Sequence, residues 1–237
     1  MGEIKVSQGP PGILEPLGDQ GVLVHLASEE LARGFAEAVK TAGLPWVVEV
    51  LVAYRCVAVF YDLELTDYAT VTQQLSTLPF CGYTEPGRLV YVPCCYELGP
   101  DLLEVASLCR CRVEEVIALH SGQVYTIYAI GFVPGFPYLG YLLERLAGVP
   151  RLEQPRRQVD AGSVGIAGKQ TGIYPSAVPG GWRIIGRTPL VIADLEREYF
   201  PLRIGDRLQF VPIGRSEFER LRGHRLEDSY SANKAST

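Results

Sequence analysis

The chain has 237 residues, of which 47% are hydrophobic and 21% are charged, and its formal net charge at pH 7 is −5. This composition is typical of a globular protein with one large domain or two small ones. The negative charge argues against nonspecific binding to nucleic acid or to an anionic membrane. No stretch approaches the roughly 20 apolar residues of a membrane span, and the N-terminus does not resemble a signal peptide. We therefore expect a cytoplasmic protein without nucleic-acid or membrane partners.

The six cysteines indicate reduced thiols rather than a disulfide framework, because the chain is large and carries no export signal. Neither the Cys94-Cys95 pair nor the Cys109-x-Cys111 pair has the C-x-x-C spacing of a zinc site, and no histidine lies at finger spacing. We predict structural or incidental cysteines and no metal site.

The first part of the chain alternates strand and helix patterns. Ser28 and Asp67 are each placed to cap a helix whose apolar residues recur at helical spacing. Runs rich in β-branched residues are expected as strands at 22–26, 46–52 and 56–61. The order β-α-β-β-α predicts a ferredoxin-like layer of an α+β protein. This layer needs one further strand, and residues 88–92 are a candidate for it.

A break in composition follows this layer. Residues 79–87 contain two prolines and two glycines and show no periodicity. We therefore predict an N-terminal α+β domain at 1–83 and a second domain at 84–225. The polar residues 226–237 are expected to form a disordered tail.

The second domain is organised around residues 130–189. This stretch contains 11 of the 25 glycines and 7 of the 17 prolines, which excludes long helices. Aromatic and β-branched residues interleave with the glycines and require burial, so short strands joined by tight turns are expected. The stretch predicts a compact β-barrel or sandwich, preceded by two helices that begin near Gly99-Pro100-Asp101 and Val113.

Polar side chains among glycine-rich turns are candidates for a small-molecule site, because a ligand can approach the backbone there. His120 lies at the end of a helix. It is either a general acid or base beside the ligand or a histidine favoured by the helix dipole. Arg187 either holds a substrate carboxylate or pairs with Asp194 or Glu196. The remaining candidates for substrate binding are Phe136, Gln170 and Tyr174.

Lys169 lies in a glycine-rich segment but not in a phosphate-binding loop. The motif G-x-x-x-x-G-K-[ST] fails at both ends, where Ser163 and Gln170 stand instead of the required residues. A lysine in a surface turn is the default interpretation. The motifs therefore identify no ATP site in this chain.

Four segments in order carry a family resemblance: GFVPGFPYLG (131–140), AGSVGIAGKQTGIYP (161–175), PGGWRIIGRTP (179–189) and GDRLQFVPI (205–213). They resemble the KipI-like family, also called allophanate hydrolase subunit 1 or carboxyltransferase domain, subdomains C and D. The resemblance implies an α/β N-terminal domain followed by a cyclophilin-like β-barrel. It also strengthens the candidacy of His120, because the family has a matching histidine.

The resemblance also implies an activity. The family includes the B subunit of a bacterial ATP-dependent 5-oxoprolinase, which converts 5-oxo-L-proline to L-glutamate together with KipA-like and LamB/YcsF-like partners. It implies a chain that is inactive alone, with ATP used by the assembled complex and a small carboxylic acid or amide as substrate. Other relatives inhibit a sensor histidine kinase or belong to a urea carboxylase/allophanate hydrolase system. Two departures from the family pattern, a shortened segment at 96–102 and Asp160, leave the substrate open.

Overall fold

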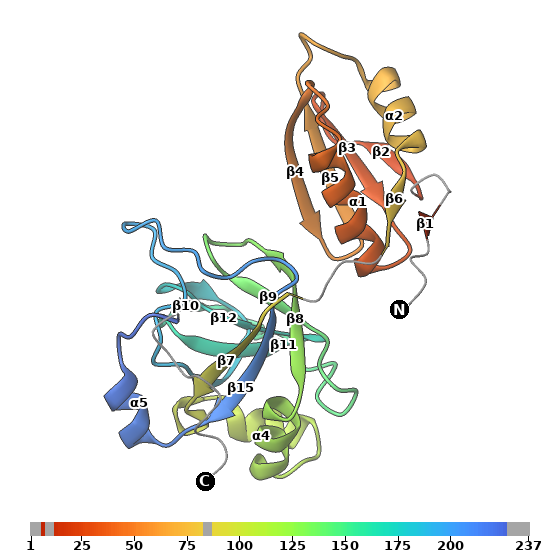
Figure 1. Cartoon of the computed structure of the whole chain (residues 1–237). Coiled ribbons are helices and arrows are strands. Elements are labelled where there is room, and N and C mark those ends of the chain that lie inside the picture. Colours follow the sequence, from red (N-terminus) through yellow and green to blue (C-terminus); the bar gives the residue numbers. More distant parts are fainter. Residues whose placement is uncertain (1–5, 8–11, 83–86, 227–237) are drawn as a thin grey trace. The chain divides into compact units, whose positions relative to one another are not determined.

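The computed structural model describes residues 6–7, 12–82 and 87–226, and the chain forms two compact units, Met1–Pro86 and Gly87–Thr237 (Figure 1). The predicted domain boundary after residue 83 and the tail at 227–237 lie outside the described residues. Leu226, which was expected in the tail, is buried against the core of the second unit. No helix in the described part of the chain is long and apolar enough to cross a membrane.

The first unit is a four-stranded antiparallel sheet with the order β2-β3-β5-β4. Its strands are β2 (Leu14–Pro16), β3 (Gly21–His25), β4 (Val47–Ala53) and β5 (Cys56–Tyr61). Two helices, α1 (Glu29–Thr41) and α2 (Tyr68–Thr77), contribute to one apolar core with this sheet. A short additional pair consists of β1 (Val6–Ser7) and β6 (Phe80–Cys81).

The predicted β-α-β-β-α order and both helix caps are confirmed. Ser28 Oγ accepts a hydrogen bond from the backbone N–H of Leu31 at 3.3 Å, and Asp67 Oδ1 accepts one from Thr70 at 2.8 Å. The proposal that residues 88–92 complete this sheet is wrong. The strand beside β3 is the preceding β2, whose three residues end at a proline, as an edge strand permits. So short a strand has too little periodicity to be recognised from sequence.

The second unit contains a seven-stranded sheet with the order β14-β11-β12-β9-β8-β15-β7 that curls into a nearly closed barrel. Its strands are β7 (Leu89–Cys94), β8 (Val124–Ile130), β9 (Pro137–Gly140), β11 (Ser163–Ala167), β12 (Gln170–Ile173), β14 (Arg183–Arg187) and β15 (Arg207–Pro212). A separate pair, β10 (Arg156–Val159) and β13 (Val178–Gly180), contributes Val159 to a small cluster that includes Ile184 of β14 and Trp182. The α+β class and the barrel are therefore present as expected.

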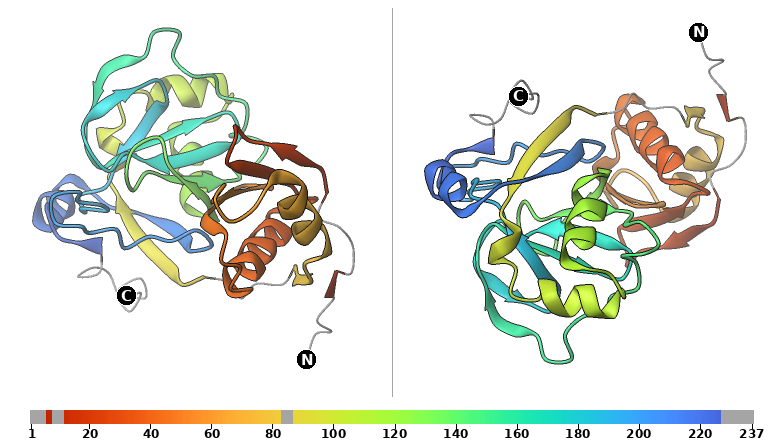
Figure 2. Two further views of the ribbon diagram at one scale, coloured as in Figure 1. Left: turned by 90° about the horizontal axis from the view of Figure 1, so that it is seen from above. Right: turned by 90° about the horizontal axis from the view of Figure 1, so that it is seen from below.

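Helices cover part of this barrel. They are η1 (Tyr96–Leu98), α3 (Leu102–Leu108), α4 (Val113–Ser121) and α5 (Arg215–Leu221). In the right-hand view of Figure 2, α3 and α4 (yellow-green) lie across one end of the barrel. Their buried side chains, among them Val105 and Val116, belong to the main core of this unit.

The two edges of the barrel are joined by a β-bridge between Cys95, directly after β7, and Arg187, the last residue of β14. The backbone N–H of Cys95 donates to the Arg187 carbonyl at 2.8 Å, and the N–H of Arg187 donates to the Cys95 carbonyl at 3.0 Å. Glycines allow the two segments to approach. A Cβ at Gly186 would lie 2.6 Å from Cys94 Sγ, and a Cβ at Gly99 would collide with the carbonyl group of Ile185.

His120 is part of the barrel core, with an exposed fraction of 0%. Its Nδ1 lies 2.7 Å from the Tyr96 hydroxyl, and its Nε2 lies 2.9 Å from Thr171 Oγ1. The Thr171 hydroxyl donates to the Gly165 carbonyl at 3.0 Å, so it accepts from the imidazole N–H. Burial lowers the pKa of His120 to about 3. The ring is therefore neutral. It does not carry the positive charge that a helix dipole would favour at this position.

Gly186→Ala should destabilise the second unit, because its new methyl group would overlap Cys94 at the closure of the barrel. We expect a loss of roughly 1–3 kcal/mol in the free energy of unfolding, measured by urea denaturation. Gly131→Ala is the matched control. Gly131 has no φ in the left-handed region and has open space around its Cβ position, so the loss should stay within about 0.5 kcal/mol. Equal losses for both variants would contradict the role of Gly186.

His120→Gln should flatten the pH dependence of stability. Below pH 6.5 the unfolded histidine takes up a proton that the folded one, with a pKa of about 3, does not bind. Wild-type stability therefore falls as the pH drops from 6.5 to 5, by up to about 1.4 kcal/mol per pH unit from this group. Denaturation at both pH values should show a shallower slope for His120→Gln. A slope equal to that of the wild type would contradict a buried, neutral His120.

Candidate functional site

The five residues predicted to form a site lie in four different places. Phe136 and Tyr174 line one pocket, Gln170 lines a second and Arg187 lines a third, whereas His120 is enclosed in the core. The five predicted residues therefore do not line one common cavity. Successive residues of a strand point to opposite faces of the sheet. Thr171 thus contacts His120 inside the barrel, while its neighbour Gln170 lines a pocket.

The first pocket is a cavity of about 220 Å³ walled by aromatic side chains. The ring of Phe136 is centred 5.1 Å from that of Tyr174 and 5.5 Å from that of Trp182, and both contacts are edge-to-face. Glycines make room for the rings, since a Cβ at Gly172 would lie 2.8 Å from Phe136 and one at Gly180 would lie 2.5 Å from the Tyr174 hydroxyl. The cavity offers an apolar, preformed site for a small molecule.

Phe132 stands at this pocket in an unusual conformation. Its φ is +70°, in the left-handed region that a bulky side chain seldom adopts, and 60% of the residue is exposed. Its ring makes edge-to-face contacts with Phe136 and Tyr174. An exposed aromatic ring held in a strained conformation at a pocket is a recurrent feature of ligand sites.

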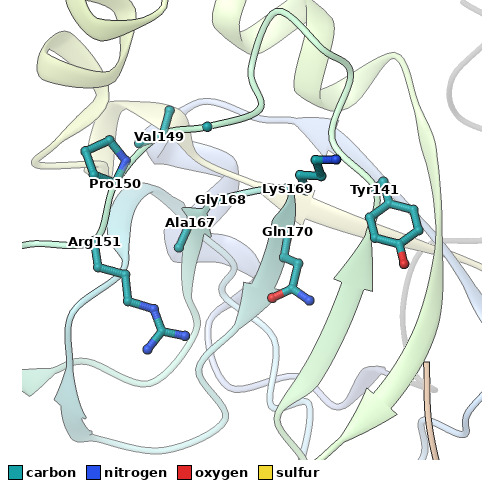
Figure 3. Close-up of a pocket in the computed structure, with 9 residues that line it drawn as sticks. Tyr141, Val149, Pro150, Arg151, Ala167, Gly168, Lys169 and Gln170 are labelled. Atoms are coloured by element: carbon teal, nitrogen blue, oxygen red, sulfur yellow. The ribbon is translucent and has the colours of Figure 1, made fainter. Parts of the chain in front are cut away.

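A second pocket, of about 510 Å³, shares Arg151 with the aromatic pocket. Figure 3 shows Arg151 on one side of it and Tyr141 on the other, with Lys169 and Gln170 between them on the β11–β12 hairpin. No carboxylate is among the lining residues of this pocket. Within the described ranges, neither Arg151 nor Lys169 forms an ion pair. Two cations without an internal counter-ion make this pocket attractive to an anion.

The sequence predictions did not include Arg151 as a site residue. Its position depends on a long-range bridge between Val149 and Gly168, which sets the loop that carries Arg151 beside the hairpin tip. The available signal was an arginine directly after Pro150, in a loop within the glycine-rich stretch. Nothing in the local pattern distinguished it from Arg156 or Arg157.

Arg187 pairs with neither Asp194 nor Glu196, so that alternative is wrong. Its Nε donates to the Ala161 carbonyl at 2.9 Å and its Nη1 donates to Asp160 at 3.1 Å. Asp194 instead pairs with Arg197 at 3.6 Å. The backbone of Arg187 closes the barrel, while its side chain lies at the third pocket.

The described residues do not include a typical site for a metal or for nucleotide phosphates. Among them, no group of three or more histidine, cysteine, aspartate or glutamate side chains is placed to hold a metal ion. Lys169 lies at the tip of a hairpin between two strands. A phosphate-binding loop would need a helix N-terminus directly after it, so this turn does not fit ATP.

Comparisons with known proteins agree with this architecture. Residues 13–202 match the family described as carboxyltransferase domain, subdomain C and D. The chain is 37% identical over 229 residues to the 5-oxoprolinase B subunit of Bacillus subtilis. This alignment covers 86% of this chain and 94% of the relative.

Two solved structures are also similar. The crystal structure of TTHA0988 is 35% identical with a TM-score of 0.71, covering 82% of this chain but only 40% of that longer chain. The urea carboxylase of Kluyveromyces lactis is 16% identical with a TM-score of 0.68, covering 92% of this chain and 24% of that chain, and it supports the fold alone. By its sequence and its fold, this chain belongs to the carboxyltransferase domain, subdomain C and D family, the KipI-like family.

Proposed function

We propose that this chain is the B subunit of an ATP-dependent 5-oxoprolinase, which converts 5-oxo-L-proline to L-glutamate. The observation that carries the proposal is the 37% identity to the Bacillus subtilis protein over 94% of its length. Similarity over nearly the whole length of one subunit favours the same place in an assembly. The partners that we propose are a KipA-like subunit and a LamB/YcsF-like subunit.

The two pockets that share Arg151 suit the substrate chemically. 5-Oxoproline is a five-membered lactam ring that carries one carboxylate. We place the ring among Phe136, Tyr174 and Trp182, where aromatic faces surround a small cavity. Arg151 lies at the border of this cavity and can hold the carboxylate through two parallel hydrogen bonds.

Two further groups of these pockets have roles in this proposal. Burial raises the pKa of Tyr174, so its hydroxyl stays protonated at neutral pH and can donate a hydrogen bond to a carbonyl oxygen. Gln170 and Lys169 extend the site on the far side of Arg151. Lys169 adds positive charge near the position that we assign to the carboxylate.

His120 has a positioning role in this proposal. Both ring nitrogens already have hydrogen-bond partners inside the core, and none of the three pockets is lined by it. Proton transfer at the scissile amide and the use of ATP are therefore assigned to groups of the partner subunits. This division of labour explains why the chain alone is expected to be inactive.

Reconstitution tests the proposed assembly. The purified chain is mixed with its KipA-like and LamB/YcsF-like partners, ATP and 5-oxo-L-proline, and glutamate formation is measured. We expect glutamate from the three proteins together and none when any one is omitted. Full activity from the two partners alone would contradict the subunit role. Inactivity of all three, together with tight binding to a histidine kinase, would favour regulation instead.

Arg151→Gln should weaken substrate use in the reconstituted enzyme. Loss of a charged hydrogen-bonding partner for the carboxylate should lower kcat/KM by about 10- to 100-fold, mainly through KM. Arg157→Gln removes a nearby exposed arginine that lines none of the three pockets and should leave kcat/KM within about twofold. A normal KM for Arg151→Gln would remove this residue from the site.

A further inference from the structure

A third pocket lies on the barrel apart from the proposed substrate site, with which it shares no lining residue. It encloses about 340 Å³ beside β10, β11 and β14. Two arginines, Arg156 and Arg187, line it together with Ser163 and one carboxylate, Asp160. Each arginine is paired with one carboxylate, Arg156 with the buried Asp101 and Arg187 with Asp160. The pocket therefore suits an anion through the hydrogen-bond donors that these pairs leave unused.

Hydrogen bonds within the protein position both guanidinium groups. Arg156 Nη2 donates to Asp101 Oδ1 at 2.6 Å, and the other oxygen of this buried carboxylate accepts the backbone N–H of Ile184 at 2.7 Å. Arg187 Nε donates to the Ala161 carbonyl at 2.9 Å. These contacts fix the two guanidinium groups before a ligand binds. Binding then loses less conformational entropy of the two side chains.

Donor groups remain after these contacts are made. Arg156 Nη1 is buried and has no acceptor within the described part of the chain. A buried donor without an acceptor is unfavourable, so turning Nη1 toward an acceptor in the pocket would cost it no existing hydrogen bond. Ser163 lies directly opposite Arg187 in the register of β11 and β14, and its side chain is among the pocket lining. Two guanidinium groups and a hydroxyl are the donors that bind carboxylate and phosphate groups in proteins.

Asp160 occupies one of the positions that a ligand would use. Its Oδ2 accepts from Arg187 Nη1 at 3.1 Å, and 56% of its side chain is exposed. An ion pair this exposed contributes little stability, so an incoming anion can replace the carboxylate. We infer that this pocket binds a small oxyanion, a carboxylate or a phosphate group, and that Asp160 competes with it for Arg187. This site does not depend on the proposed function.

Isothermal titration calorimetry of the full-length chain with sodium phosphate and with sodium acetate, at constant ionic strength, tests the inference. Arg187→Gln should weaken binding at least about tenfold, since it removes one fork but leaves the backbone bridge to Cys95. Asp160→Asn should strengthen it several-fold, because the amide keeps its shape without competing as an anion. The control Arg157→Gln removes an exposed cation that lines none of the three pockets and should change neither affinity.

The opposite effects of the first two variants separate this inference from a general response to charge or to stability. Preference for phosphate or for acetate identifies which oxyanion the pocket takes, and either preference supports the site. Wild-type protein without saturable binding of either anion would overturn it. So would Arg187→Gln with wild-type affinity, Asp160→Asn with weakened affinity, or loss of binding in Arg157→Gln. A thermal melt of each variant verifies folding, and Asp160→Asn retains both arginines if Arg187→Gln does not fold.

Discussion

The second unit depends on one backbone contact, the pair of hydrogen bonds between Cys95 and Arg187 that joins the edges of the barrel. A sheet edge left open would expose unpaired N–H and C=O groups, and this bridge pairs two of each. Close approach at this point requires Gly99 and Gly186, which have no side chain to separate the strands. Asp101 reinforces the same region, because its buried carboxylate is bonded to the backbone of Ile184 on β14.

Closure divides the side chains of each strand into an enclosed set and an outer set, and this division determines where ligands can bind. The enclosed set forms the main core, in which His120 is bonded on both sides and remains neutral. Side chains of the outer set, such as Ser163 on β11 and Gln170 on β12, instead line pockets, together with the loops and the β10–β13 pair. These pockets therefore lie outside the barrel, where the glycines allow rings and arginines to approach the backbone.

Much of the fold was predictable because it follows from local chemistry. The caps at Ser28 and Asp67, the alternating strands of the first unit and the glycine-spaced strands after residue 130 each depend on neighbours within one element. The stretch at 130–189 predicted a barrel or a sandwich, and the family resemblance selected the barrel. The partner of β3 was not predictable, because a three-residue strand carries almost no pattern, and β7 was equally suited to either sheet until its parallel pairing with β15 was known.

Several residues that line the candidate pockets were predictable, but which of them share a pocket was not. Phe136, Tyr174 and Gln170 do line pockets, yet the residue that those pockets share, Arg151, is brought there by a bridge between distant loops. His120 was chosen from its position on a helix, and that pattern is the same for a ligand-facing histidine and an enclosed one. Only the Tyr96 and Thr171 contacts, which join segments 24 and 51 residues away, distinguish the two.

The most direct test of the central claim, that the substrate site lies outside the barrel around Arg151, is an NMR titration of the isotope-labelled chain with 5-oxo-L-proline. We predict shifts in the backbone amides of Gly168, Lys169, Gly180 and Gly181 and in the indole N–H of Trp182, all of which belong to residues that line the two pockets. The imidazole resonances of His120 should stay unchanged. Shifts centred on His120, Tyr96 and Thr171, or no shifts at the pocket residues at saturating ligand, would contradict the account.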